Sequence, residues 1–360
     1  MRPRFRPVFL ALGLTLACQP SQTETSGFTT KPAMTTTPAS TSDAMQGDTS
    51  SSSGGQSGST SASSTTSTTN SDTSAGGSNT TLILDVGSDK DVGDATPPGC
   101  KGKIDFLFVI SRGANMQSSQ AKLIAAFPKF IETIESKFAD FDFHIMVIDG
   151  DTEWGLEPCD ADCQMQGSCE VPDYPCDLLG LVTTCDRTIG AGNVFAAGAN
   201  AMNQPCTIAG GRRYLTKEQP NLSETFSCIA KLGVSGRDLL GEALTMAMKP
   251  EINAPGGCNA GFLRDDALLM VTFIGGYDDG SKWDPGTWAA NVLKAKKGDY
   301  GAAVMLSILD PKCPPYDRIC ELVEKFPYHL VADSQLEDHA AAFDAATDLI
   351  EAACAEYIPG

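Results

Sequence analysis

After residue 100, near-continuous apolar runs alternate with segments whose apolar residues recur every three or four positions. The runs 104–110 and 266–274 lack the polar alternation of a half-exposed strand, which is typical of parallel strands covered on both faces. Between the first two strands, 118–138 has the helical period, although Pro128 should kink or interrupt that helix. Because strands and helices take turns along the chain, we predict a three-layer, Rossmann-like α/β domain with a mostly parallel sheet.

The rest of the domain continues this alternation with one interruption. Further strands are expected at 141–148, 302–309 and 328–332, and helices at 222–232, 239–248, 285–297, 319–326 and 336–355. The interruption is an insertion at about 150–220 that is rich in Gly, Pro and Asp and holds six cysteines: Cys159, Cys163, Cys169, Cys176, Cys185 and Cys206. We expect a loop-rich lobe held by three bridges, although the sequence does not choose among their fifteen pairings.

The cysteine count indicates an exported protein. The chain has 13 cysteines, and setting aside Cys18 leaves an even number, which is consistent with up to six disulfides. Cys100 and Cys354 bracket the domain and form the first expected bridge. The next expected pairs are Cys228 with Cys258 and Cys313 with Cys320. Structural zinc is disfavoured because the chain has no Cys-x-x-Cys pair and only three histidines.

The first residues have the pattern of a secretion signal. Three arginines precede the apolar run 8–17, which is too short to span a bilayer. The run ends at Leu14-Thr15-Leu16-Ala17-Cys18, which resembles the lipobox of bacterial lipoproteins; the alternative is an ordinary signal peptide cut at a nearby small residue. We expect 1–18 to be removed and Cys18 to carry the lipid. Because Gln19 follows it rather than Asp, the outer membrane or cell surface is the expected destination.

A tether is predicted at 19–99. Ser, Thr, Gly, Ala and Pro dominate it, and no aromatic residue occurs between Thr29 and Asp105. Such a composition cannot bury enough apolar surface to offset the entropy of ordering, so disorder is expected. The formal net charge of −19 argues against nucleic acid as a partner and against peripheral binding to anionic lipid. Membrane contact is therefore expected through the lipid anchor only.

Three segments, in this order and spacing, resemble the von Willebrand factor A-like (vWA-like) domain of lipoproteins from myxobacteria and their relatives. They are 103–110 with the polar turn after it, 261–274 with the acidic turn after it, and the final helix that ends at Cys354. The resemblance covers 100–360. It implies a divalent cation at the carboxyl ends of the strands, held by an Asp-x-Ser-x-Ser turn, a Thr or Ser in a second loop, and an Asp after the fourth strand.

Here those positions have lost the two acids. The family's Asp, Ser and Ser fall on Ser111, Gly113 and Asn115, and its later Asp falls on Gly276. Since Mg²⁺ usually needs one or two carboxylates, we expect no metal and no other cofactor. Either the fold survives only as a scaffold, or the loops at the carboxyl ends of the strands still bind a partner without a metal ion. In the second case Arg112, or Arg237 beside Ser235 in the second loop, would grip a partner carboxylate; otherwise each arginine is a solvated charge.

Two further possibilities stay open. Asp278 and Asp279 could hold Ca²⁺ at the rim, or they could be merely solvated. A serine hydrolase could use Ser111, which follows a strand and precedes Gly113, but Val109 stands where the tight turn needs glycine. Its base would be one of the three histidines: His144, His329 or His339.

The leading hypothesis is therefore a non-enzymatic, lipid-anchored envelope or cell-surface protein that binds an unknown protein or surface ligand through a degenerate vWA-like domain. The alternative is a structural envelope protein with no ligand site.

Overall fold

The computed structural model describes residues 100, 102–151, 154, 174–234, 238–276, 279–309, 313 and 316–357. All of them belong to the second of the two compact units of the chain, 84–360. The expected signal peptide 1–18, the lipid site Cys18 and the tether 19–99 lie outside the described residues. Within the described ranges, no helix is both long and apolar enough to cross a bilayer.

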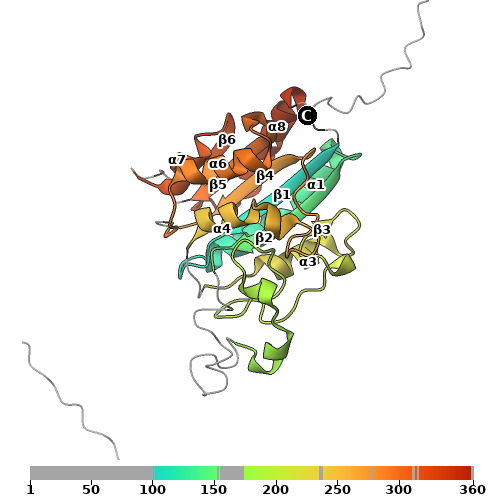
Figure 1. Ribbon diagram of the computed structural model, residues 1–360, viewed down its shortest axis with the longest axis vertical. Helices are drawn as coiled ribbons and strands as arrows, with labels where there is room; N and C mark the ends of the chain where they lie inside the picture. The colour runs from blue at the N-terminus through green and yellow to red at the C-terminus, as the bar shows by residue number, and fades with distance from the viewer. Residues whose placement is uncertain are drawn as a thin grey trace, which may run out of the picture. The chain divides into compact units, whose positions relative to one another are not determined.

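Six strands form one sheet in the order β3-β2-β1-β4-β5-β6 (Figure 1). β3 runs antiparallel to β2 at one edge, and all other neighbours are parallel, which confirms the predicted α/β fold. Every residue of β4 and β5 is buried, and only Lys103 of β1 is partly exposed, as strands covered on both faces require. The strands are β1 (Lys103–Ile110), β2 (Asp142–Asp149), β3 (Leu215–Thr216), β4 (Leu268–Ile274), β5 (Ala303–Leu309) and β6 (Tyr328–Asp333).

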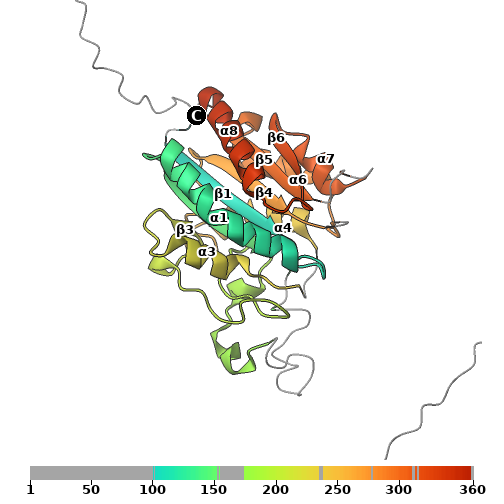
Figure 2. The same cartoon turned by 180° about the vertical axis from the view of Figure 1, so that it is seen from behind.

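Helices cover both faces of the sheet, so the domain has the predicted three layers. One hydrophobic cluster joins the sheet to α1 (Gln117–Lys137), α3 (Leu222–Ala230) and α8 (Ala340–Glu356). The other joins it to α4 (Leu240–Ala247), α6 (Pro285–Ala295) and α7 (Arg318–Val323), and the short α5 (Pro250–Asn253) follows α4. Figure 2 shows α1 and α8 in front of the sheet, on the opposite side from α4.

Pro128 does not interrupt α1. The helix continues from Gln117 to Lys137 with the proline inside it. Its apolar side chains, including Phe127 and Phe130, are buried against the sheet and neighbouring helices. Burial of this face therefore outweighs the roughly 3 kcal/mol that an internal proline costs a helix.

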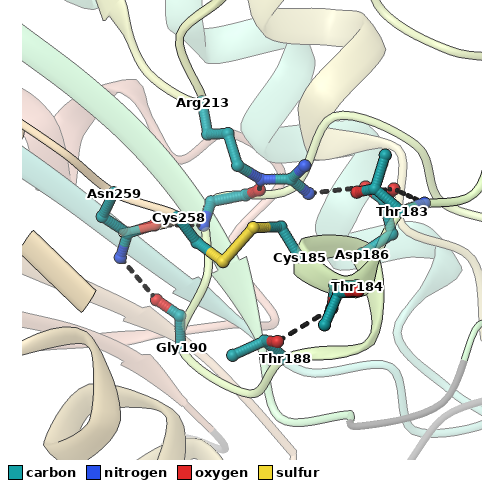
Figure 3. The surroundings of a disulfide bond; sticks show 10 residues. Thr183, Thr184, Cys185, Asp186, Thr188, Gly190, Arg213, Cys258 and Asn259 are labelled. Carbon is teal, nitrogen blue, oxygen red and sulfur yellow. Dashed lines mark hydrogen bonds and ion pairs between the residues drawn. A yellow bond between two sulfur atoms is a disulfide. The ribbon is translucent and has the colours of Figure 1, made fainter. Parts of the chain in front are cut away.

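The described part of the insertion is tied to the rest of the domain by a disulfide and by hydrogen bonds. Cys185 bonds to Cys258, and next to this disulfide the Asn259 amide donates to Gly190 O (2.8 Å) and accepts from Gly192 N (2.9 Å) (Figure 3). Within the insertion, the short helices are η1 (Cys176–Leu181), η2 (Thr184–Arg187) and η3 (Ala209–Gly211); a fourth, η4 (Tyr300–Ala302), precedes β5. A small separate core holds Trp154, Tyr174, Phe195 and Ala197.

The disulfides correct one predicted pair and confirm two. Cys100–Cys354 and Cys313–Cys320 form as expected. The predicted Cys228–Cys258 pair is wrong, because Cys228 bonds to Cys206 and Cys258 to Cys185. Two insertion cysteines, Cys185 and Cys206, thus bond to cysteines outside the insertion. Cys176 is also disulfide-bonded, and Cys159, Cys163 and Cys169 lie outside the described residues. Several disulfides indicate an oxidising compartment outside the cytoplasm.

Buried charges gather near the amino-terminal ends of the central strands. Asp105 of β1 is fully buried and accepts from Arg264 N and Nε, both at 2.8 Å. Burial raises the pKa of Asp105 to about 6, although Arg264 and Lys296 oppose that shift. His144 of β2 lies 3.6 Å from Asp105 and donates from Nδ1 to Phe262 O (2.9 Å). Desolvation lowers the pKa of His144 to about 4, so burial shifts both groups toward their neutral forms, although Asp105 remains mostly ionised at pH 7 beside Arg264.

Candidate functional site

Three loops converge at the carboxyl ends of β1 and β4. The register pairs Ile110 with Ile274, and Ser111 N then donates to Ile274 O (2.8 Å). The turn after β1, which carries Ser111 to Met116, therefore lies beside Gly275 and Gly276 after β4. The third loop is the segment before α4, which brings Asp238 into the same place. We call this meeting of the three loops the mouth.

Asp238 is the residue that sequence reasoning missed. The Ser111 hydroxyl donates to its Oδ1, Gly113 N donates to Ser111 Oγ (3.0 Å), and the backbone N–H groups of Arg112 and Gly113 also bond to the Asp238 carboxylate. Desolvation raises the pKa of Asp238, and these neutral donors oppose the shift. The signal in the sequence was an acid in the second loop, directly before the predicted helix 239–248. The sequence-based prediction named Ser235 and Arg237 in that loop but not Asp238.

Oxygen atoms surround the face of Gly113. A Cβ built on this glycine would lie 2.8 Å from Asp238 Oδ2, 3.3 Å from Ser111 Oγ and 3.6 Å from Asn115 Oδ1. A Cβ on Gly276 would lie 3.4 Å from the same Asn115 oxygen. The structure therefore brings four predicted residues together around the carboxylate of Asp238, which was not predicted. The four are Ser111, Gly113, Asn115 and Gly276.

A polar cavity of about 200 Å³ opens beside the mouth. Lys122 in its wall donates from Nζ to Ser334 O (3.1 Å). The lining comes from the start of α1 and from the segments after β4 and β6: Asn115, Met116, Ser118, Ser119, Lys122, Gly275, Gly276, Ser334 and Gln335. These residues can offer hydrogen bonds to a side chain that enters from a partner.

Arg112 does not enter the mouth. It is only 2% exposed and donates from Nη2 to Ala197 O (2.6 Å), while Nη1 lies 3.4 Å from Asp149 and 3.5 Å from Asp151. The expectation that it grips a partner, and the alternative of a solvated charge, are both wrong. The carboxylates at the end of β2 draw the guanidinium under the insertion. Ser235 and Arg237 lie outside the described residues.

Asp279 is a buried structural acid rather than a rim ligand. Its carboxylate accepts from Gly241 N (3.1 Å), Ser281 N (3.1 Å) and Ser281 Oγ (2.8 Å), so it holds the first turn of α4. Neither the calcium nor the solvated interpretation fits this residue, because the start of α4 and its own turn use its oxygens. Asp278 lies outside the described residues.

The residues of the mouth do not fit the divalent ion that the resemblance implies. Ser111 and Gly276 replace the family's acids, and among the described mouth residues Asp238 alone contributes a carboxylate, whose Oδ1 accepts from the Ser111 hydroxyl. Among the described residues, no group of three or more His, Cys, Asp or Glu is placed to hold a metal. A hard cation such as Mg²⁺ prefers several free oxygen ligands, and the described residues of the mouth do not provide such a set.

The geometry also contradicts Ser111 as a hydrolase nucleophile. Its side chain is fully buried, and its hydroxyl bonds to Asp238. His144 pairs in register with Asp105, six residues before Ser111, which is about 20 Å along the strand. His329 bonds through Nδ1 to Phe326 O (2.6 Å) within its own segment, and His339 is buried at the start of α8.

No family model and no curated protein matches the chain. Its matches to solved structures are distant and concern vWA-type folds. Proximal thread matrix protein 1 from the mussel byssus has a TM-score of 0.36 and 11% identity, covering 71% of this chain and 47% of that one. A von Willebrand factor type A structure from Catenulispora acidiphila has a TM-score of 0.37 and 11% identity, covering 70% and 42%. The pilus adhesin SpaC from Lactobacillus rhamnosus GG has a TM-score of 0.33 and 9% identity, covering 69% and 30%. The chain spans less than half the length of each.

Proposed function

We propose that this protein is a non-enzymatic, lipid-anchored surface protein that binds a partner through the mouth, without a metal ion. The observation that carries the proposal is the convergence of Ser111, Asn115, Asp238 and Gly276 from three loops, beside a polar cavity at the carboxyl edge of a parallel sheet. Ligands of open α/β sheets bind at this edge, because the loops that follow the strands all meet there.

Exposed apolar side chains near this edge support a protein partner. Tyr316, in the loop after β5, is 94% exposed, and Leu336, in the turn after β6, is 45% exposed. Large exposed side chains next to polar hydrogen-bonding groups are typical of protein contact surfaces, where aromatic residues act as anchors.

Binding of the labelled full chain to intact cells of the producing bacterium tests the site. Asn115→Arg places a bulky cation in the mouth and should abolish saturable binding. Ser136→Arg makes the same charge change on the exposed far end of α1, about 30 Å from its start, and should bind like the parent. Equal binding by both variants would remove the mouth from the proposal. The absence of saturable binding by the parent would favour the structural envelope protein instead.

Metal independence has its own measurement. Calorimetric titration of the full chain with Mg²⁺ should give no saturable heat, and partner binding should persist in excess chelator. A binding isotherm that disappears in Asp238→Asn would show that the mouth holds an ion after all.

The anchor is proposed from the sequence pattern that ends at Cys18. Cys18→Ser should move the protein from the membrane fraction to the soluble fraction and prevent incorporation of labelled fatty acid. An attached diacyl group would anchor the chain, since each buried CH₂ contributes roughly 0.8 kcal/mol. Unchanged fractionation of the variant would favour an ordinary cleaved signal peptide.

A further inference from the structure

We propose that the mouth recognises a cationic side chain, a lysine or arginine of the partner, and that Asp238 is the residue that binds it. This inference rests on the proposed function and specifies its chemistry. It is the reverse of the expectation that an arginine of this chain would grip a carboxylate of the partner.

The mouth offers acceptors that lack a positive charge. Asp238 Oδ2 and Asn115 Oδ1 lie 2.8 Å and 3.6 Å from the position of a Cβ on Gly113, while the buried Ser111 hydroxyl between them is already bonded to Asp238. Asp238 is partly exposed, and the described groups that bond to it are neutral: the Ser111 hydroxyl and the backbone N–H groups of Arg112 and Gly113. A carboxylate held by neutral groups at an accessible edge still attracts a cation, because charge-assisted hydrogen bonds are about twice as strong as neutral ones.

Three basic side chains that the structure describes around this edge are bound elsewhere. Arg112 is turned under the insertion toward Asp149 and Asp151. Lys122 donates to Ser334 O, and Arg318 donates to Ser281 O (2.6 Å) and stacks on the ring of Trp288 (4.7 Å). None of these three described cations forms an ion pair with Asp238, so none of them neutralises its carboxylate.

A carboxylate from the partner is disfavoured at the same place. It would approach the carboxylate of Asp238, and like charges repel when they come close near a protein surface. The missing side chain of Gly276 leaves room beside Asn115 and Met116 for the apolar stem of a lysine.

Three small probes test the inference on the full chain: the Nα-acetyl methylamides of lysine, norleucine and glutamate. The readout is the NMR shift of the Gly113 and Asn115 amides during titration. The lysine probe should give saturable shifts and the other two should not. Asp238→Asn, which keeps an acceptor for the Ser111 hydroxyl, should weaken the lysine probe by about tenfold or more.

The charge-matched control is Asp348→Asn, at an exposed acid on α8 that pairs with Lys137. It should leave the affinity of the lysine probe unchanged, which separates a specific site from the general attraction of a chain with charge −19. Equal lysine shifts in the parent and Asp238→Asn, or saturable glutamate shifts, would overturn the inference. If cells still bind the parent but not Asn115→Arg while the lysine probe fails, the proposed function stands and only its cationic chemistry is wrong.

Discussion

Two aspartates lie near opposite ends of the same sheet, and their surroundings differ. Asp105, toward the amino end, is fully buried, bonds twice to Arg264 and has Lys296 nearby. Asp238, at the carboxyl end, is partly exposed, and the described hydrogen-bond donors to its carboxylate are the Ser111 hydroxyl and two backbone N–H groups. Burial raises the pKa of both. What separates them is the counter-charge: Arg264 bonds to Asp105, whereas no cation among the described residues pairs with Asp238.

The largest expected effect comes from breaking the completed pair. Arg264→Met leaves Asp105 buried without its cation and should lower the free energy of unfolding by about 3 to 5 kcal/mol. Loss of the cation also raises the pKa of Asp105 further, so the cost should be greater at pH 8 than at pH 5, where the acid can protonate. Urea unfolding at both pH values measures this, and a loss below about 1 kcal/mol would mean that the pair is not structural.

The opposite pKa shifts of Asp105 and His144 predict opposite pH dependences of stability for variants of these two residues. Between pH 4 and 6, folded Asp105 keeps a proton that the unfolded acid has lost, so its contribution to stability falls as pH rises. His144 is unprotonated when folded and protonated when unfolded, so its contribution rises with pH over the same window.

Relative to the parent, Asp105→Asn should therefore gain stability as pH increases from 4 to 6, and His144→Gln should lose it. Each slope is at most about 1.4 kcal/mol per pH unit. Unfolding curves at half-unit pH steps compare the three proteins. Parallel curves for both variants would show that neither group titrates abnormally.

At the other end, Asp238→Asn should change the free energy of unfolding by less than about 1 kcal/mol, because no ion pair is broken. Since folding raises the pKa of Asp238, its stabilising contribution is present in acid and is lost as pH rises. The variant should therefore gain on the parent toward neutral pH. A loss above about 2 kcal/mol would make Asp238 a structural residue like Asp105.

The smallest effect is expected on the surface. Lys129→Ala removes an exposed ion pair with Asp344, 2.9 Å apart, that links α1 to α8. Such pairs contribute little because water screens them and two long side chains must be ordered. The denaturation midpoint should not move measurably, so this variant serves as the control for the Asp105 and Asp238 variants. A clear shift would mean that exposed ion pairs also contribute to the stability of this domain.

The sequence by itself determined the layers of this domain and the bridge across its ends. Runs such as 104–110 and the period of 118–138 predicted strands and helices, because burial of a whole face leaves a local, repeating pattern. Cys100 and Cys354 were paired because they bracket one domain, and Ser111 and Gly276 were placed together because the ends of parallel strands share an edge.

Only the tertiary structure decided which charges are free. Arg112 is buried by Asp149 and Asp151, Asp279 is used by Gly241 and Ser281, and Cys206 bonds to Cys228 instead of a cysteine of the insertion. Each of these partners comes from another element of the fold or depends on how a loop turns. Contacts between residues far apart in the sequence produce no repeating pattern in it, because the packing of distant elements determines which side chains meet. The same holds for Asp238, which became a candidate when the structure placed its carboxylate on Ser111, with no cation of the described residues paired to it.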